Sequence, residues 1–327
     1  MSLFWRLTAV TSIGLIAAAG VVVSGSDAMA AARPHLRTAA AASPAIPQLG
    51  FVQTANTASG TVEVHIDTFS NGFHRVLNAT TDFSLADAAN GTFQLFGNVN
   101  GEPELGFIKF PAPGSPNVEV QLDAFSNGSY HRVLNAATDF AVGTGLGPFQ
   151  LFGSVNGEPE LGFVLSPDFQ HFPAEVFVDD FISGSYQRTS SPFSDLRPDE
   201  VPTPIFQLFG RDSGEPELGS INTANTASGT VELHADAVLS AGGGYTRILN
   251  ATSDFSPADR ANGTFQLFGS ANGDPEFGFI KTANTGTHTV EVHADAITNG
   301  SYQRFLDSGS DFSPADAANG SFQLIGN

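Results

Sequence analysis

The tripeptide Phe93-Gln94-Leu95 recurs four more times along the chain, at residues 149–151, 206–208, 265–267 and 322–324. The copies are spaced 56 to 59 residues apart. A second pattern, a glutamate between two apolar residues, keeps nearly the same spacing, at Glu63, Glu119, Glu175, Glu232 and Glu291. Because two markers repeat in one register, the sequence predicts five structural repeats that together cover residues 49–327.

Each repeat contains four short runs of strand-forming residues. In the last repeat the runs are residues 279–281, 289–293, 302–306 and 321–325. The breaks between them carry Asn284-Thr285-Gly286, Asn299-Gly300 and Asn319-Gly320, which supply the positive φ angles of hairpin turns. One unit is therefore a four-stranded antiparallel meander, with residues 311–317 as its only candidate helical turn.

Five such units predict an all-β fold, a five-bladed β-propeller with four antiparallel strands per blade. The 29 phenylalanines suit sheets that are buried on both faces. Since the repeats open on Leu49-Gly50-Phe51 and end on residues 321–325, we expect the C-terminal strand to complete the first blade. An open β-solenoid is the alternative architecture.

The N-terminus has the parts of a secretory signal: Arg6, an apolar run over residues 7–23, and Ala28-Met29-Ala30 as a cleavage site. We expect residues 1–30 to be removed and residues 31–48, rich in Ala and Pro, to form a flexible leader. The expected location is therefore extracellular, with no integral membrane segment in the mature chain. There are no cysteines, so stability must come from packing and backbone pairing.

The charge balance restricts the partners. Thirteen Lys and Arg stand against 33 Asp and Glu, for a net charge of −20. Such a chain repels phosphate backbones, so nucleic acid is not expected as a partner.

The stretch from Phe96 to Ile108, FGNVNGEPELGFI, resembles the FG-GAP and VCBS-type propeller repeat, in which a strand leads into an acidic, Gly-containing loop and a second apolar strand. The resemblance covers residues 49–327. It implies blades that serve adhesion or carbohydrate recognition, and loops that bind calcium. The candidate metal ligands are Asn98, Asn100, Glu102, Glu104, Asn156, Glu158, Glu160, Asn272, Asp274 and Glu276. The loops are shorter than the family's and lack its first Asp, so the alternative is a tight hairpin whose acids are solvated.

Three charged positions recur in all five repeats. The strand glutamate is followed four residues later by an aspartate, at Asp67, Asp123, Asp179, Asp236 and Asp295. An arginine follows at Arg75, Arg132, Arg188, Arg247 and Arg304, and seven residues beyond it a further aspartate at Asp82, Asp139, Asp195, Asp254 and Asp311. Because the glutamate strand lies beside the arginine strand, we expect one cross-strand ion pair per blade, with a guanidinium that bridges two carboxylates. This pattern favours a structural network; the competing hypothesis places the arginine in a ligand pocket.

An aromatic residue stands two positions before each arginine, at Phe73, Tyr130, Tyr186, Tyr245 and Tyr302. Aromatic rings with polar neighbours are typical of sugar-binding sites, so these aromatics and the five arginines are the candidate ligand-binding residues. The alternative is an aromatic that caps the core.

These observations predict a secreted, multivalent binding module for a glycan or cell-surface ligand, without catalytic residues. Two alternatives remain open: an adhesion scaffold that binds proteins, and a propeller-type glycoside hydrolase whose carboxylates come from different blades. The divergent third repeat, with Pro192, Pro198, Pro202 and Pro204, is the place to look for an enzymatic site.

Overall fold

The computed structural model describes residues 44, 46–99, 102–111, 117–141, 146–155, 158–165, 175–194, 205–212, 215–224, 226–238, 243–271 and 274–326. The predicted signal sequence (1–30) lies outside the described residues, as does the predicted leader up to residue 43. Within the described residues, no helix is both long and apolar enough to cross a membrane.

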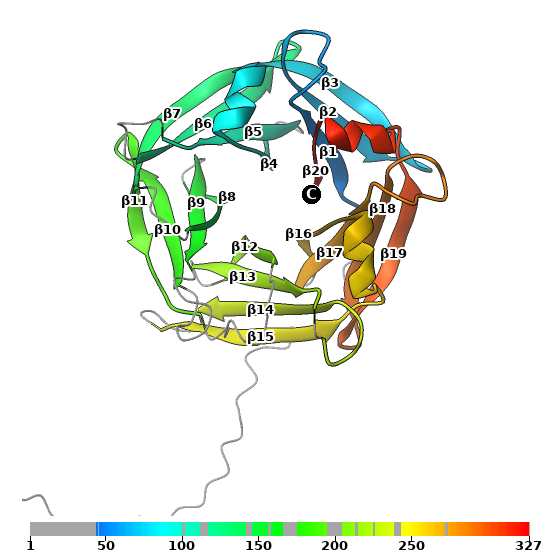
Figure 1. Ribbon diagram of the computed structural model, residues 1–327. Coiled ribbons are helices and arrows are strands. Elements are labelled where there is room, and N and C mark those ends of the chain that lie inside the picture. Colours follow the sequence, from blue (N-terminus) through cyan, green and yellow to red (C-terminus); the bar gives the residue numbers. More distant parts are fainter. Residues whose placement is uncertain are drawn as a thin grey trace, which may run out of the picture. The chain divides into compact units, whose positions relative to one another are not determined.

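Five four-stranded antiparallel sheets surround a common axis (Figure 1), so the predicted five-bladed propeller is confirmed. The C-terminal strand β20 (Gly320–Ile325) pairs with the first strand β1 (Gln48–Gln53). Phe51 lies opposite Phe322 in this pairing, and their rings stack with centroids 4.5 Å apart. The first and last segments of the repeated region therefore share one blade, as the sequence predicts.

The remaining strands follow in chain order. Blade one adds β2 (Thr61–Phe69) and β3 (Phe73–Ser84). Blade two contains β4 (Gly91–Val99), β5 (Glu102–Lys109), β6 (Asn117–Ser126) and β7 (Ser129–Ala141). Blade three contains β8 (Leu146–Val155), β9 (Glu158–Leu165), β10 (Glu175–Ile182) and β11 (Ser185–Ser190). Blade four contains β12 (Ile205–Asp212), β13 (Glu215–Asn222), β14 (Glu232–Val238) and β15 (Tyr245–Thr252). Blade five contains β16 (Gly263–Ala271), β17 (Asp274–Lys281), β18 (Glu291–Thr298) and β19 (Ser301–Gly309).

The Phe-Gln-Leu tripeptide lies on the innermost strand of every blade, where both faces of the sheet are covered. Successive side chains of a strand point to opposite faces. In β4, Leu95 packs toward blade one, while Gln94 reaches toward blade three. This alternation places the apolar side chains of Phe93 and Leu95 on one face of the strand and the amide of Gln94 on the other.

The five glutamines close the inner edge of the ring. Gln94 donates a hydrogen bond from Nε2 to the carbonyl of Leu151 in the next blade and accepts one from the Leu151 amide. The four other glutamines each bind the next inner strand through the same two kinds of bond: Gln150, Gln207, Gln266 and Gln323. The side-chain amides thus satisfy backbone groups that an unpaired edge strand would leave exposed.

The leucine of the tripeptide packs into a glycine of the neighbouring blade. A Cβ atom on Gly106 would lie 2.2 Å from Cδ1 of Leu151, and one on Gly219 would lie 2.1 Å from Cδ1 of Leu267. The same arrangement recurs at Gly50, Gly162 and Gly278. The glycine that follows Leu or Phe at this repeat position is therefore required by the close approach of two blades.

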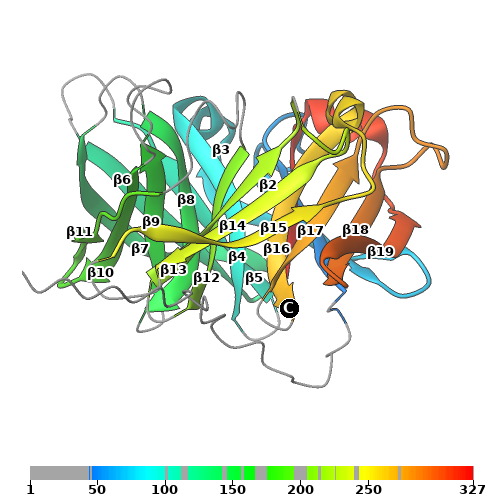
Figure 2. The same cartoon turned by 90° about the horizontal axis from the view of Figure 1, so that it is seen from below.

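Three short 3-10 helices lie at one face of the ring, and the C-terminus lies at the other (Figure 2). They are η1 (Leu85–Asn90), η2 (Pro257–Asn262) and η3 (Pro314–Ala318). Each begins at a serine that forms a capping box with an aspartate three residues later, as between Ser313 and Asp316. The helical turn expected within residues 311–317 is confirmed. We call this face the helical face.

Candidate functional site

The repeated arginines form the expected cross-strand ion pairs. The partner of each arginine is the aspartate, rather than the glutamate, of the preceding strand. Arg132 Nε lies 2.6 Å from Asp123 Oδ1, and Arg188 Nε lies 2.8 Å from Asp179 Oδ1. The aspartates are fully buried, while the arginine side chains are 24 to 30% exposed. Equivalent pairs form at Arg75 with Asp67, Arg247 with Asp236 and Arg304 with Asp295.

The hairpin register determines which acid pairs with the arginine. From Ser126 opposite Ser129, the pairing of β6 with β7 places Asp123 opposite Arg132, while Glu119, beyond a register shift at Leu122, lies opposite Ala137. The glutamates have other partners: Glu119 binds Lys109, and Glu63 accepts a hydrogen bond from the Ser59 amide. The glutamate is therefore not the arginine's partner.

The arginine also binds the neighbouring blade. The amide of Arg132 donates to Asp82 in blade one, and its guanidinium lies 4.3 Å from the centroid of the Phe83 ring. In blade five, Arg304 binds both Asp295 and Asp254 of blade four, as expected for a guanidinium that bridges two carboxylates. The geometry supports the structural network, because Arg75, Arg132, Arg188 and Arg304 each join two blades.

Burial opposes ionisation of the paired aspartates. It raises the pKa of Asp179 to about 7 and that of Asp295 to about 6, although the hydrogen bonds from Arg188 and Arg304 act in the opposite direction. These acids lie between blades and have no surface open to a ligand.

The repeated aromatics lie in the core. Phe73, Tyr130, Tyr186, Tyr245 and Tyr302 are at most 3% exposed. Each tyrosine hydroxyl donates to a proline carbonyl of the same blade, as Tyr130 does to Pro103 at 2.9 Å. Because burial covers the rings and the hydroxyls are already bonded, these residues behave as core aromatics and present no ring face for a sugar.

The acidic loops are described only in part. The side chains of Asn98, Asn100, Glu102, Asn156 and Asn272 lie outside the described residues, whereas Glu104, Glu158, Glu160, Asp274 and Glu276 lie within them. Burial raises the pKa of Glu104, and the charge of Glu158 in the next blade raises it further. In the described part of the chain, no three His, Asp or Glu side chains are grouped so as to hold a metal ion. Calcium binding stays a prediction.

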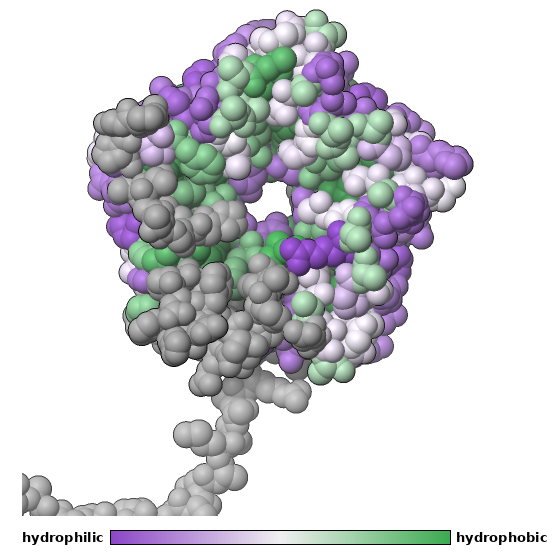
Figure 3. All heavy atoms as spheres, viewed as in Figure 1, coloured by the Kyte–Doolittle hydropathy of each residue, from purple (hydrophilic) through white to green (hydrophobic). Residues whose placement is uncertain are grey.

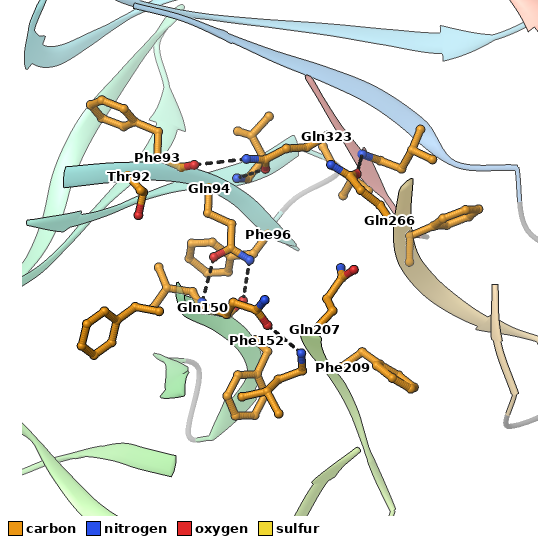
Figure 4. A pocket seen from close by; sticks show the side chains of 18 of the residues that line it. Thr92, Phe93, Gln94, Phe96, Gln150, Phe152, Gln207, Phe209, Gln266 and Gln323 are labelled. Carbon is orange, nitrogen blue, oxygen red and sulfur yellow. Dashed lines mark hydrogen bonds between the residues drawn. The ribbon is translucent and has the colours of Figure 1, made fainter. Parts of the chain in front are cut away.

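Among the residues that the structure describes, two cavities lie along the axis. A cavity of about 500 Å³ is surrounded by the inner strands and their glutamines (Figure 4). A second, of about 760 Å³, lies toward the helical face and shares Thr92, Phe93, Thr264, Gln266 and Gln323 with the first. The space-filling view shows the opening at the axis (Figure 3). The two cavities adjoin at these five shared residues, and each has the size that small ligands occupy.

Hydroxyl groups line one side of this space. Thr92, Thr264 and Ser321 each precede the Phe-Gln-Leu tripeptide on β4, β16 and β20, and all three are exposed. These strands belong to blades two, five and one, which are neighbours in the ring. Thr54 and Thr282 add two hydroxyls from the ends of β1 and β17. None of the described residues that line either cavity carries a charge.

An apolar wall completes the lining. Phe110, Phe149, Ile205 and Phe206 contribute to it from blades two, three and four. Phe110 is 39% exposed, and its ring centroid lies 6.4 Å from that of Phe149. We call Thr54, Thr92, Thr264, Thr282 and Ser321 together with Phe110 the axial site.

The sequence interpretation missed the axial site because it compared what all five repeats share. The signal is a difference between repeats. The position before Phe-Gln-Leu is Thr or Ser in three repeats but Pro148 and Ile205 in the other two. Breaks in the pattern, rather than the pattern itself, identify the residues at the axis.

No family model and no curated protein matches this sequence. Solved structures of similar arrangement include a protein from Bacteroides uniformis that is provisionally assigned as a 6-phosphogluconolactonase. It is 13% identical to this chain, the match covers 87% of this chain and 73% of that protein, and the TM-score is 0.36. A protein from Bacteroides fragilis with the same provisional assignment is 9% identical over 86% of this chain and 98% of its own, with a TM-score of 0.30. A protein from Lactobacillus plantarum is 10% identical over 85% of this chain and 99% of its own, also with a TM-score of 0.30. The five-bladed arrangement expected from the five repeats is confirmed, while membership of the FG-GAP and VCBS-type family stays a prediction.

Proposed function

We propose that this protein is a secreted binding module that recognises a neutral carbohydrate at the axial site. The observation that carries the proposal is the pair of adjoining axial cavities, whose described lining residues are uncharged and include hydroxyls from neighbouring blades and partly exposed aromatics. A lining without charges suits a ligand that offers hydroxyl groups and apolar CH surfaces. The five repeated aromatics are buried in the core and do not line a ligand site. We therefore propose one axial site rather than five equivalent sites.

Removal of the hydroxyls tests this function. We expect Thr92→Val combined with Thr264→Val to weaken binding of an array-selected saccharide by about tenfold, because each lost hydrogen bond is worth about 0.5–1.5 kcal/mol. Valine retains the shape of threonine, and both positions are exposed. Isothermal titration calorimetry gives the affinity.

Thr80→Val is the matched control, because Thr80 is exposed on the outer strand β3, away from the axis. Unchanged affinity in the double variant, or equal loss in the control, would refute binding at the axis.

A second candidate function is adhesion through the outer wall. Val76, Val133 and Ile248 occupy the same position on the outer strands of three blades and are 57, 59 and 41% exposed. Blade three has Thr189 there. If these side chains contact a protein surface, their joint replacement by Thr should abolish adhesion of the purified protein to that surface without a change in saccharide binding.

A further inference from the structure

In every blade one residue directly follows the second strand. It is a threonine in three of the five repeats, at Thr54, Thr223 and Thr282. In blade two it is Phe110. The ring is 39% exposed although most phenylalanines of the described chain are buried. An aromatic residue that interrupts a polar repeat position and stays partly in solvent contributes little to the core.

The surroundings of Phe110 hold it beside the axial cavity. Its amide donates to the carbonyl of Asn90 at 2.7 Å, which fixes the backbone next to the start of β4. Asn90 in turn is held by a hydrogen bond to the Ala86 carbonyl. The ring lines the same cavity as Thr92 and Thr264. A hydroxyl-bearing wall and a partly exposed aromatic therefore border one space.

We infer that Phe110 is a stacking platform for the apolar face of a pyranose ring, so that the axial site selects cyclic sugars over open-chain polyols. The inference rests on the proposed function. Axial CH groups of a pyranose form a flat apolar face that packs against an aromatic ring, while the ring hydroxyls point outward to polar groups. A flexible polyol offers hydroxyls but no such face, and it loses more conformational entropy on binding.

The test compares methyl β-glucopyranoside with sorbitol, an open-chain polyol that carries more hydroxyls but no ring. Saturation-transfer and titration NMR measure both affinities. We expect the wild-type protein to prefer the pyranoside by at least about tenfold, and the sugar CH protons to shift upfield through the ring current. Phe110→Thr, which installs the residue of the other repeats, should bring the preference close to one, and Phe110→Trp should retain it.

Each outcome bears on one claim. If Phe110→Thr keeps both the preference and the upfield shift, the platform is refuted. If Thr92→Val with Thr264→Val weakens both probes while Phe110→Thr changes neither, the proposed function stands and only the platform fails. If the wild-type protein binds neither probe, or prefers sorbitol, the inference fails outright. An unchanged melting temperature in Phe110→Thr, expected from its exposure, shows that the fold is intact.

Discussion

At the scale of single residues, the repeated arginine has three tasks at once. Arg132 neutralises the buried Asp123, binds Asp82 of the preceding blade through its amide, and covers the Phe83 ring. A charge at 0% exposure is tolerable only when its partner is present. The arginine is therefore a structural residue that joins two sheets.

Replacement of Arg132 by Met should destabilise the protein by about 3–5 kcal/mol, since it leaves Asp123 buried without its partner. Chemical denaturation gives the free energy of unfolding. The double variant Arg132→Met with Asp123→Leu removes both charges and should recover most of the loss. Equal stability of the single variant and the wild-type protein would show that Asp123 does not need the guanidinium.

A second residue-scale feature is the neutral His65. Its Nδ1 faces Nη1 of Arg75 at 3.0 Å, and its Nε2 faces Oε1 of Gln53 at 3.0 Å. Burial and the charge of Arg75 lower the pKa of His65 to about 4. Because the folded protein holds His65 neutral, the stability that this residue contributes to the fold is fully present above pH 6.5. That stability is lost as the pH falls toward 4.

His65→Gln removes this titration, and the blade-two equivalent, Gln121, shows that glutamine fits the position. The stability of the wild-type protein relative to His65→Gln should fall by about 2 kcal/mol between pH 7 and pH 5, because each pKa unit corresponds to about 1.4 kcal/mol. Urea denaturation at both pH values measures the difference. A difference that does not depend on pH would contradict the neutral state of His65.

At the scale of elements, neighbouring blades fit together through a leucine and a glycine. The Cβ of a residue at position 219 would lie 2.1 Å from Leu267 Cδ1 and 2.8 Å from Phe209 Cε1. Adjacent inner strands are further tied by the glutamine amides, so they have little freedom to move apart. The interface between blades is therefore close-packed rather than loosely apolar.

Gly219→Ala should cost about 1–3 kcal/mol through overpacking. Leu267→Ala creates space at the same point, so the double variant should be less destabilised than the sum of the two single variants. A double-mutant cycle from thermal unfolding measures this coupling. Strict additivity would mean that the two positions are not in contact.

At the scale of the whole molecule, closure depends on β20. This strand pairs with β1 through six residue pairs and buries Phe322, Leu324 and Ile325. Gln323 on the same strand also binds β4 of blade two. The ring is therefore closed both within blade one and between blades one and two.

Deletion of residues 320–327 should lower the melting temperature by roughly 10 °C or more, because three buried apolar side chains are each worth about 1.5–3 kcal/mol. A synthetic peptide of residues 319–327 added in trans should restore part of the loss, and a scrambled peptide should not. Circular dichroism follows the transition. An unchanged melting temperature after deletion would show that β20 does not hold the ring closed.

The amino-acid sequence by itself determined the number of blades, the four strands of each and the shared blade, because those features repeat at fixed spacing and depend on local turn and strand preferences. Only the tertiary structure decided the roles of the repeated polar and aromatic residues. In the folded hairpin Asp123, and not Glu119, lies opposite Arg132, whose guanidinium also covers the Phe83 ring of the preceding blade. The burial of Tyr130 and the partial exposure of Phe110 depend on the packing of neighbouring sheets, which brings together residues from blades far apart in the chain.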